Sequence, residues 1–153
     1  MSMGIRRFRA SDAEKASKLI RRCLLEVNSK DYPMESIEKM CKQHSPENLI
    51  VISMKQDMYV FVRNNDVLGT GCLVQNWIQT VFVNPDYQGR GIGKKLMVHL
   101  EKVMGDRGYV TSIVPSSITA YEFYRKLGYR KTKVMNDEDS GRNIIMEKKL
   151  RKI

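Results

Sequence analysis

The stretch VFVNPDYQGRGIG, residues 81 to 93, places a glycine-rich loop directly between a strand pattern and a helix pattern. The apolar run Trp77–Val83 is typical of a strand, and it stops at Asn84-Pro85 because proline cannot donate to a ladder of hydrogen bonds. Beyond the loop, apolar residues recur at helical spacing and trace one face of a helix that ends near Gly105 and Gly108. The stretch therefore predicts a strand, a tight loop and an amphipathic helix in immediate succession.

The loop itself has the features of an anion-binding site. Glycine has no Cβ, so Gly89, Gly91 and Gly93 allow positive φ angles and a close approach of the backbone to a ligand. The helix that follows begins with unpaired N–H groups and the positive end of its dipole, a combination that binds phosphate or pyrophosphate. Further positive charge comes from Arg90, Lys94 and Lys95. The alternative is a tight turn that happens to use glycine, but the flanking strand and helix favour anion binding.

Two common nucleotide-binding motifs do not fit the loop. A dinucleotide fingerprint has the spacing G-x-G-x-x-G, which is not found here. A Walker loop, G-x-x-x-x-G-K-[ST], fails because Gln88 stands where its first glycine belongs and Lys95 where Ser or Thr belongs. The anion is therefore not predicted to be a dinucleotide or a P-loop nucleotide.

A second segment, AYEFYRKLGY at residues 120 to 129, accompanies the loop. Together the two segments resemble the GNAT superfamily of acetyl-CoA-dependent N-acetyltransferases, whose signature is a strand, then Q/R-x-x-G-x-G/A, then a helix. Residues 88 to 93, QGRGIG, match that signature, and residues 120 to 129 match the family pattern A-x-x-F-Y-x-K-x-G-F/Y. The likeness is strong from about Val67 to Arg130, and before Val67 only the layout of one strand and two helices agrees.

The resemblance implies how acetyl-CoA would be held. Its pyrophosphate would lie on the backbone amides of the loop residues Gln88, Gly89, Arg90, Gly91, Ile92, Gly93 and Lys94. Its pantetheine arm would pair like an extra strand along Val81, Phe82 and Val83, where that strand splays from the strand Val110 to Val114. A backbone N–H near Phe82 or Val83 would polarise the thioester carbonyl, as in an oxyanion hole. The side chains of Val81 and Val83 are expected to pack in the core.

The resemblance makes Tyr124 the expected catalytic side chain. A phenol with an ordinary pKa of about 10 could donate a proton to the departing CoA thiolate. Ser117, two helical turns earlier, is predicted to project from nearly the same face and stands where family members often carry an Asn that touches CoA. The alternatives are that Tyr124 is a packed helix tyrosine, or that Tyr121 is the residue concerned.

The general base is not identified by the resemblance. An attacking amine with a pKa of about 10.4 must first lose a proton, and Trp77 occupies the position where several family members carry Glu. Glu35, Glu38 and His44 lie in the segment that usually forms the acceptor side, and each is expected to be an ordinary surface residue. A water relay to the main chain is the other possibility. His99 is expected to face solvent and to take no part.

The rest of the chain predicts a single α/β domain spanning residues 1–153, with a central mixed, mostly antiparallel sheet flanked by helices. A first helix is expected from a capping box at Ser11 and Glu14, and a second helix after Pro33. The stretch Asn48 to Gln56 fits either a strand or a helix. Hairpins are expected over residues 58–75 and 129–149, and a helix over 117–127.

Composition narrows the partners. The net charge is +10, but Lys and Arg are scattered and are not interleaved with aromatic residues, so specific nucleic-acid binding is not expected. No apolar run reaches about 18 residues, so no membrane partner is expected. Three cysteines and two histidines are too dispersed for a disulfide framework or a metal site, which favours a cytoplasmic, metal-free protein. The protein is expected to be a monomer or a homodimer.

Two functions therefore remain open. The first is transfer of an acetyl group from acetyl-CoA to a primary amine by direct attack in a ternary complex, the acceptor being a small amine, an amino acid or a protein amine. The second is a catalytically weak module that keeps the fold, binds CoA and interacts with an anionic or protein partner. The missing carboxylate favours the module, whereas Tyr124 and the intact loop favour the enzyme.

Overall fold

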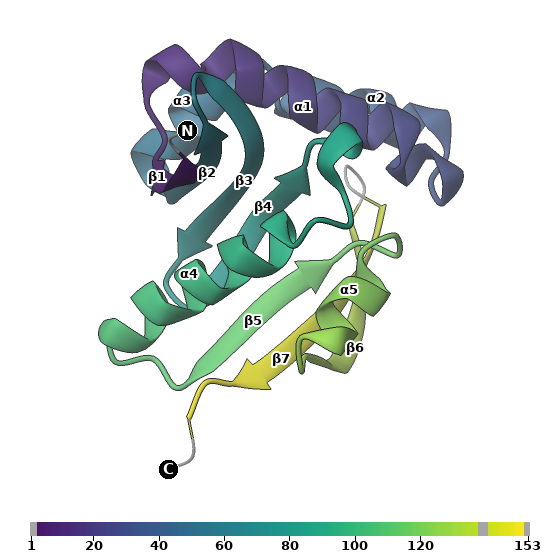
Figure 1. Cartoon of the computed structure of the whole chain (residues 1–153). Helices are drawn as coiled ribbons and strands as arrows, with labels where there is room; N and C mark the ends of the chain where they lie inside the picture. Colours follow the sequence, from purple (N-terminus) through teal and green to yellow (C-terminus); the bar gives the residue numbers. More distant parts are fainter. Residues whose placement is uncertain (1–2, 138–140, 152–153) are drawn as a thin grey trace.

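The computed structural model describes residues 3–137 and 141–151, in which a seven-stranded sheet runs in the order β1-β2-β3-β4-β5-β7-β6 (Figure 1). Its strands are β1 (Met3–Arg7), β2 (Asp57–Arg63), β3 (Asp66–Val74), β4 (Trp77–Val83), β5 (Thr111–Ser116), β6 (Arg130–Asp137) and β7 (Gly141–Lys149). Neighbouring strands are antiparallel except for β4 and β5, which are parallel. The prediction of a mixed, mostly antiparallel sheet is confirmed.

The parallel pair β4 and β5 stays together only at its beginning. Trp77 faces Ile113, and the Ile113 N–H donates to the Asn76 carbonyl at 2.9 Å, but no further pairing joins the two strands in the described chain. Toward their carboxyl ends the strands separate, which leaves a wedge-shaped gap in the sheet between Val83 and Ser116 (Figure 1). We refer to this gap as the wedge.

Helices cover both faces of the sheet: α1 (Ala13–Glu26), α2 (Met34–Gln43), α3 (Pro46–Lys55), α4 (Ile92–Asp106) and α5 (Tyr121–Lys126). The side chains of β2 alternate between the two faces, as those of a strand must. Met58 and Val60 pack in a core with α1, α2 and α3, whereas Tyr59 and Phe61 pack toward α4. Figure 1 shows α4 and α5 together in front of the strands, so the two helices share one side of the wedge.

Two glycines of β3 allow α4 to pack closely against the sheet. A Cβ added to Gly69 would lie 2.8 Å from Leu96 Cδ1, and a Cβ added to Gly71 would lie 2.8 Å from Leu100 Cδ1. Both distances are too short for real carbon atoms, so α4 is seated closely against β3, and a larger residue at either position would force the leucine side chain to move. This contact holds the start of α4, and with it the glycine loop, beside β4.

The structure corrects several local predictions. The predicted capping box of Ser11 and Glu14 is not formed. The first helical turn is capped instead by the carboxylate of Asp12, which accepts the Arg9 N–H at 2.8 Å. The Arg6 guanidinium holds Asp12 in this position by donating to the same carboxylate. The ambiguous stretch Asn48 to Gln56 lies mainly in helix α3, which Ser45 caps by accepting the Asn48 N–H. The helix predicted over 117–127 is shorter and begins at Tyr121, while α4 runs through Gly105 to Asp106.

Candidate active site

A β-bulge in β4 shapes the edge of the wedge. The pairing with β3 shifts between Thr70 and Cys72, and Thr80 adopts a φ of 57°, which is unusual for a β-branched residue. The buried Thr70 hydroxyl donates to the Thr80 carbonyl at 2.7 Å and so helps to stabilise this conformation. Strained backbone that is held by its neighbours is common at functional sites.

Beyond the bulge, the direction of the backbone groups follows from one hydrogen bond. The Asn84 N–H donates to the Leu68 carbonyl of β3 at 2.8 Å. Because the N–H and C=O groups of successive strand residues point to opposite edges, those of Val83 point away from β3, toward the side that β5 has left. The Val83 carbonyl accordingly accepts from the Gln88 amide at 3.2 Å and from the Cys23 thiol at 2.9 Å. The Val83 N–H therefore points toward the wedge.

The glycine loop leads from this edge into α4. Gly89 and Gly91 have φ angles of 79° and 82°, where an L-residue would be strained, and a Cβ at either position would point into open space. The first main-chain bond of the helix joins the Lys95 N–H to the Gly91 carbonyl. In the described chain the N–H groups of Ile92 and Lys94, and of Gly93 between them, consequently have no acceptor. They form a row of free donors at the mouth of the wedge.

Gly93 serves a different purpose from the other two glycines. Its φ is not positive, so of the three glycines expected to allow positive φ only Gly89 and Gly91 adopt it. A Cβ on Gly93 would instead lie 3.0 Å from Phe123 Cζ and 3.5 Å from Val83 Cγ2. Gly93 thus lets β4, α4 and α5 meet at one point.

The positive charge near the loop is arranged around an aromatic ring. The Arg90 guanidinium lies 5.1 Å and that of Arg63 4.9 Å from the centre of the Tyr87 ring, and Arg63 also donates to the Tyr87 hydroxyl at 2.6 Å. Arg90 is exposed, as are Lys94 and Lys95, and none of the three forms a salt bridge within the described residues. Arg63 could not be predicted from the sequence, because it comes from the distant β2–β3 hairpin.

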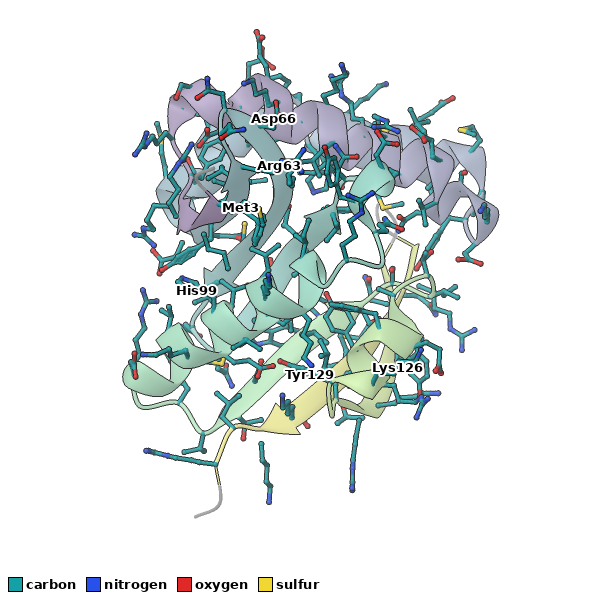
Figure 2. The ribbon with its side chains drawn as sticks, in the orientation of Figure 1. Met3, Arg63, Asp66, His99, Lys126 and Tyr129 are labelled. Atoms are coloured by element: carbon teal, nitrogen blue, oxygen red, sulfur yellow. The ribbon has the colours of Figure 1, made fainter. Side chains whose placement is uncertain are left out.

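Tyr124 lies on α5 with its ring inside the core of the α4 side. It is 6% exposed, and its ring contacts those of Phe123 and Tyr129 at centroid distances of 5.1 and 5.8 Å (Figure 2 labels Tyr129). The Tyr124 hydroxyl makes no hydrogen bond in the described chain, and its oxygen is not fully enclosed by protein atoms. Burial raises the pKa of the phenol well above its ordinary value. The hydroxyl is therefore protonated at neutral pH and free to donate.

Ser117 is placed differently from its prediction. It precedes α5 and is not part of it, so the argument that two helical turns put Ser117 and Tyr124 on one face is wrong. Its hydroxyl accepts the Ala120 N–H at 3.1 Å and so caps the turn that leads into α5. The serine hydroxyl keeps its own hydrogen for donation.

Of the candidate bases, only His44 is brought near β4. Glu35 and Glu38 are exposed on α2, as predicted. His44 is not the predicted surface residue, because its ring packs edge-on against Phe82 at a centroid distance of 5.7 Å, and this burial lowers its pKa. Its Nδ1 lies 2.7 Å from the Met40 carbonyl, which can only accept, so Nδ1 carries the hydrogen and Nε2 is free.

His99 also departs from its prediction, because its ring packs against Tyr59 at 5.0 Å instead of facing solvent alone (Figure 2 labels His99). It lies on α4 about two helical turns beyond Ile92, where the helix begins beside Val83. Within residues 3–137 and 141–151, no group of three metal-ligating side chains occurs. In the same residues, no helix has the length and apolarity needed to cross a membrane.

Comparison with known proteins identifies the family to which the fold belongs. Residues 28–150 match the model of a family described as the acetyltransferase (GNAT) domain. The chain belongs to this family. The matched region includes the glycine loop, the wedge and α5, so the predicted GNAT fold and acetyltransferase class are confirmed.

Individual GNAT proteins resemble this one along nearly its whole length. A peptidyl-lysine N-acetyltransferase, YjaB of Salmonella typhimurium, is 27% identical over 146 residues, which cover 93% of each chain. A GCN5-related N-acetyltransferase from Rhodopseudomonas palustris has the same fold, with a TM-score of 0.89 at 24% identity over 97% of this chain and 98% of that one. PaiA N-acetyltransferase from Thermoplasma acidophilum, solved in complex with coenzyme A, gives a TM-score of 0.80 at 24% identity over 97% and 99%.

Proposed function

We propose that this protein transfers an acetyl group from acetyl-CoA to a primary amine, by direct attack of the amine on the thioester in a ternary complex. A carbon–nitrogen bond forms, the carbon–sulfur bond breaks, the amine loses a proton and the CoA thiolate gains one. The observation that carries the proposal is the wedge, where a free main-chain edge of β4 adjoins the row of free N–H groups of the glycine loop. Acetyl-CoA is the co-substrate, and the PaiA complex with coenzyme A supports this choice.

The donors of the loop suit the pyrophosphate of CoA. The residues expected to hold it are Gln88, Gly89, Arg90, Gly91, Ile92, Gly93 and Lys94. Their main-chain N–H groups and the start of a 15-residue helix supply positive potential at a fixed place. The side chains of Arg90 and Lys94, which form no salt bridge within the described residues, add long-range attraction for a multiply charged ligand.

The thioester is expected to lie along Val81, Phe82 and Val83, with its carbonyl on the Val83 N–H. Phe82 is a poorer donor, because its N–H alternates with that of Val83 and points back toward β3. A main-chain donor fixed by a bulge needs no reorganisation when negative charge develops on the carbonyl oxygen. The Val83 N–H would therefore stabilise the tetrahedral intermediate.

Tyr124 would stabilise the leaving group by a hydrogen bond. The departing thiol has an ordinary pKa of about 8.5, below that of the buried phenol. Complete proton transfer from Tyr124 to the thiolate would consequently be uphill. The hydroxyl is better suited to donate a hydrogen bond as negative charge grows on sulfur, with Ser117 as a second donor nearby in the chain.

His44 is the side chain best suited to take the proton of the amine, directly or through water. Its lowered pKa keeps it neutral at pH 7, and its free Nε2 is a proton acceptor beside Phe82.

A lysine side chain is the first acetyl acceptor to test, because the Salmonella relative is a peptidyl-lysine N-acetyltransferase. We also infer a cytoplasmic location, supported by the free thiols of Cys23, Cys41 and Cys72.

The test of turnover is a screen of amines. Lysine peptides, amino acids, polyamines and aminosugars are each incubated with acetyl-CoA, and the release of free thiol is measured. Thiol release that depends on one class of amine supports the enzyme. Binding of acetyl-CoA without release in any mixture would favour the alternative, a CoA-binding module in which Trp77 stands where a catalytic carboxylate would be.

A further inference from the structure

The segment between α1 and α2 is tied to the C-terminal half of the protein by a buried tyrosine. Residues 27–33, which we call the strap, carry Tyr32, and this side chain is only 8% exposed. Its hydroxyl accepts the Ile118 N–H at 2.7 Å and donates to the Arg142 carbonyl at 3.0 Å. Its ring lies against Gly141, where an added Cβ would be 3.4 Å away. Beside it, the Thr119 hydroxyl donates to Asp31 at 2.7 Å.

These contacts lie across the open end of the wedge. The preceding helix, α1, is attached to the carboxyl end of β4, since the Cys23 thiol donates to the Val83 carbonyl and Arg22 forms a salt bridge with Asp86. Ile118, in contrast, follows the carboxyl end of β5. The strap therefore bridges the two strands at the place where they have separated.

The strap bounds the side of the wedge opposite the glycine loop. The helices α1 to α3 pack on one face of the sheet, whereas α4 and α5 pack on the other. Acetyl-CoA, held by the start of α4, would occupy the α4 side. Only the side bounded by the strap then remains for the amine.

We infer that Tyr32 is a positioning residue, which holds residues 117–120 in place and so orients α5 and Tyr124 toward the thioester. The inference rests on the proposed function. The route is short: Ile118 is bound by Tyr32, and the Ile118 carbonyl accepts the Tyr121 N–H at the start of α5. Packing of the ring alone does not explain the arrangement, because the hydroxyl also uses both its donor and an acceptor position on main-chain partners.

The test is Tyr32→Phe, which keeps the ring and removes both hydrogen bonds. The matched control is Tyr109→Phe, since the Tyr109 hydroxyl has no hydrogen bond within the described residues. Amide hydrogen exchange at Ile118 reports the bond directly, because that N–H loses its acceptor. We expect exchange at Ile118 to become about tenfold faster in Tyr32→Phe and to stay unchanged in Tyr109→Phe.

Kinetics separate positioning from mere stability. Tyr32→Phe is expected to lower kcat about tenfold at a temperature where it is fully folded, with the KM for acetyl-CoA within about twofold of the wild type. If Tyr32→Phe does not fold, Thr119→Val serves instead, because it removes the exposed hydrogen bond to Asp31. This variant is expected to speed amide exchange at Ile118 and to lower kcat, each by about twofold to threefold.

Unchanged amide exchange at Ile118 in Tyr32→Phe would refute the hydrogen bond between Ile118 and Tyr32. Faster exchange with an unchanged kcat would give Tyr32 a structural role alone and overturn the inference. The failure of the proposed function would look different. Wild-type protein that neither binds acetyl-CoA nor releases thiol would refute that function and the positioning role with it, whereas the exchange experiment needs no substrate.

Discussion

Replacement of Gly93 and of Gly105 by alanine, one at a time, compares two glycines of the same helix in opposite surroundings. Both lie in α4 with ordinary helical φ angles. Alanine favours a helix over glycine by about 1 kcal/mol, and this gain is largely common to both variants. At Gly105 the new Cβ meets nothing within 4 Å, so Gly105→Ala is expected to raise the free energy of unfolding by about 0.5–1 kcal/mol.

At Gly93 the new Cβ would lie 3.0 and 3.1 Å from two atoms of the Phe123 ring. Overpacking of this kind costs about 1–3 kcal/mol, which exceeds the gain in helix propensity. Gly93→Ala is therefore expected to lower the free energy of unfolding by about 1 kcal/mol, and to lower kcat as well, because Phe123 adjoins Tyr124 on α5.

The assay is urea unfolding followed by circular dichroism, with both variants measured beside the wild type. The difference between the two variants is expected to be about 1–3 kcal/mol, with Gly105→Ala the more stable. Equal stabilisation by both substitutions would show that α4 and α5 do not meet at Gly93, and it would remove the geometric link between the glycine loop and Tyr124.

Three further outcomes follow from the site. Tyr124→Phe is expected to lower kcat about 10–100-fold with acetyl-CoA affinity nearly intact, measured beside Tyr121→Phe; equal, small effects at both positions would make Tyr124 a packing residue. Arg90→Gln is expected to weaken acetyl-CoA binding by about threefold and to reduce the dependence of the affinity on salt. Calorimetric titrations at two ionic strengths measure both quantities, and no change in either would refute this prediction. The lowered pKa of His44 means that the unfolded chain binds a proton near the ordinary pKa of about 6.5, whereas the folded chain does not. The contribution of His44 to the free energy of unfolding should therefore be constant above that pH and fall as the pH drops below it. In urea titrations at several pH values, His44→Gln should remove part of that fall.

The parts of the fold that the sequence predicted well are those with local signals. Alternating and helical patterns located β4 and α4, and the Asn-rich turn located the β2–β3 hairpin. The capping residue of the first turn was missed, because Asp12 is selected by Arg6 of β1 and not by its neighbours in the helix. The short start of α5 was missed because Ser117 and Ala120 form a capped turn instead of helix.

The missed features of the candidate site all depend on contacts between distant segments. The role of Gly93 depends on Phe123, the place of Arg63 beside Arg90 depends on the β2–β3 hairpin, and the bulge at Thr80 depends on Thr70. His44 was placed on the surface because a single histidine carries no pattern. Its contact with Phe82 arises only when the connection between α2 and α3 folds against β4.

The central claim is that the glycine loop and the Val83 edge of the wedge hold acetyl-CoA. The most direct measurement is a titration of ¹⁵N-labelled protein with acetyl-CoA, followed through the amide signals in NMR spectra. The largest shifts are expected at the N–H groups of Ile92, Gly93 and Lys94, which have no acceptor in the described chain, and at the Val83 N–H, and Gly91→Val should abolish them. Saturating acetyl-CoA that leaves these amides unmoved, or that shifts only amides remote from the wedge, would contradict the account.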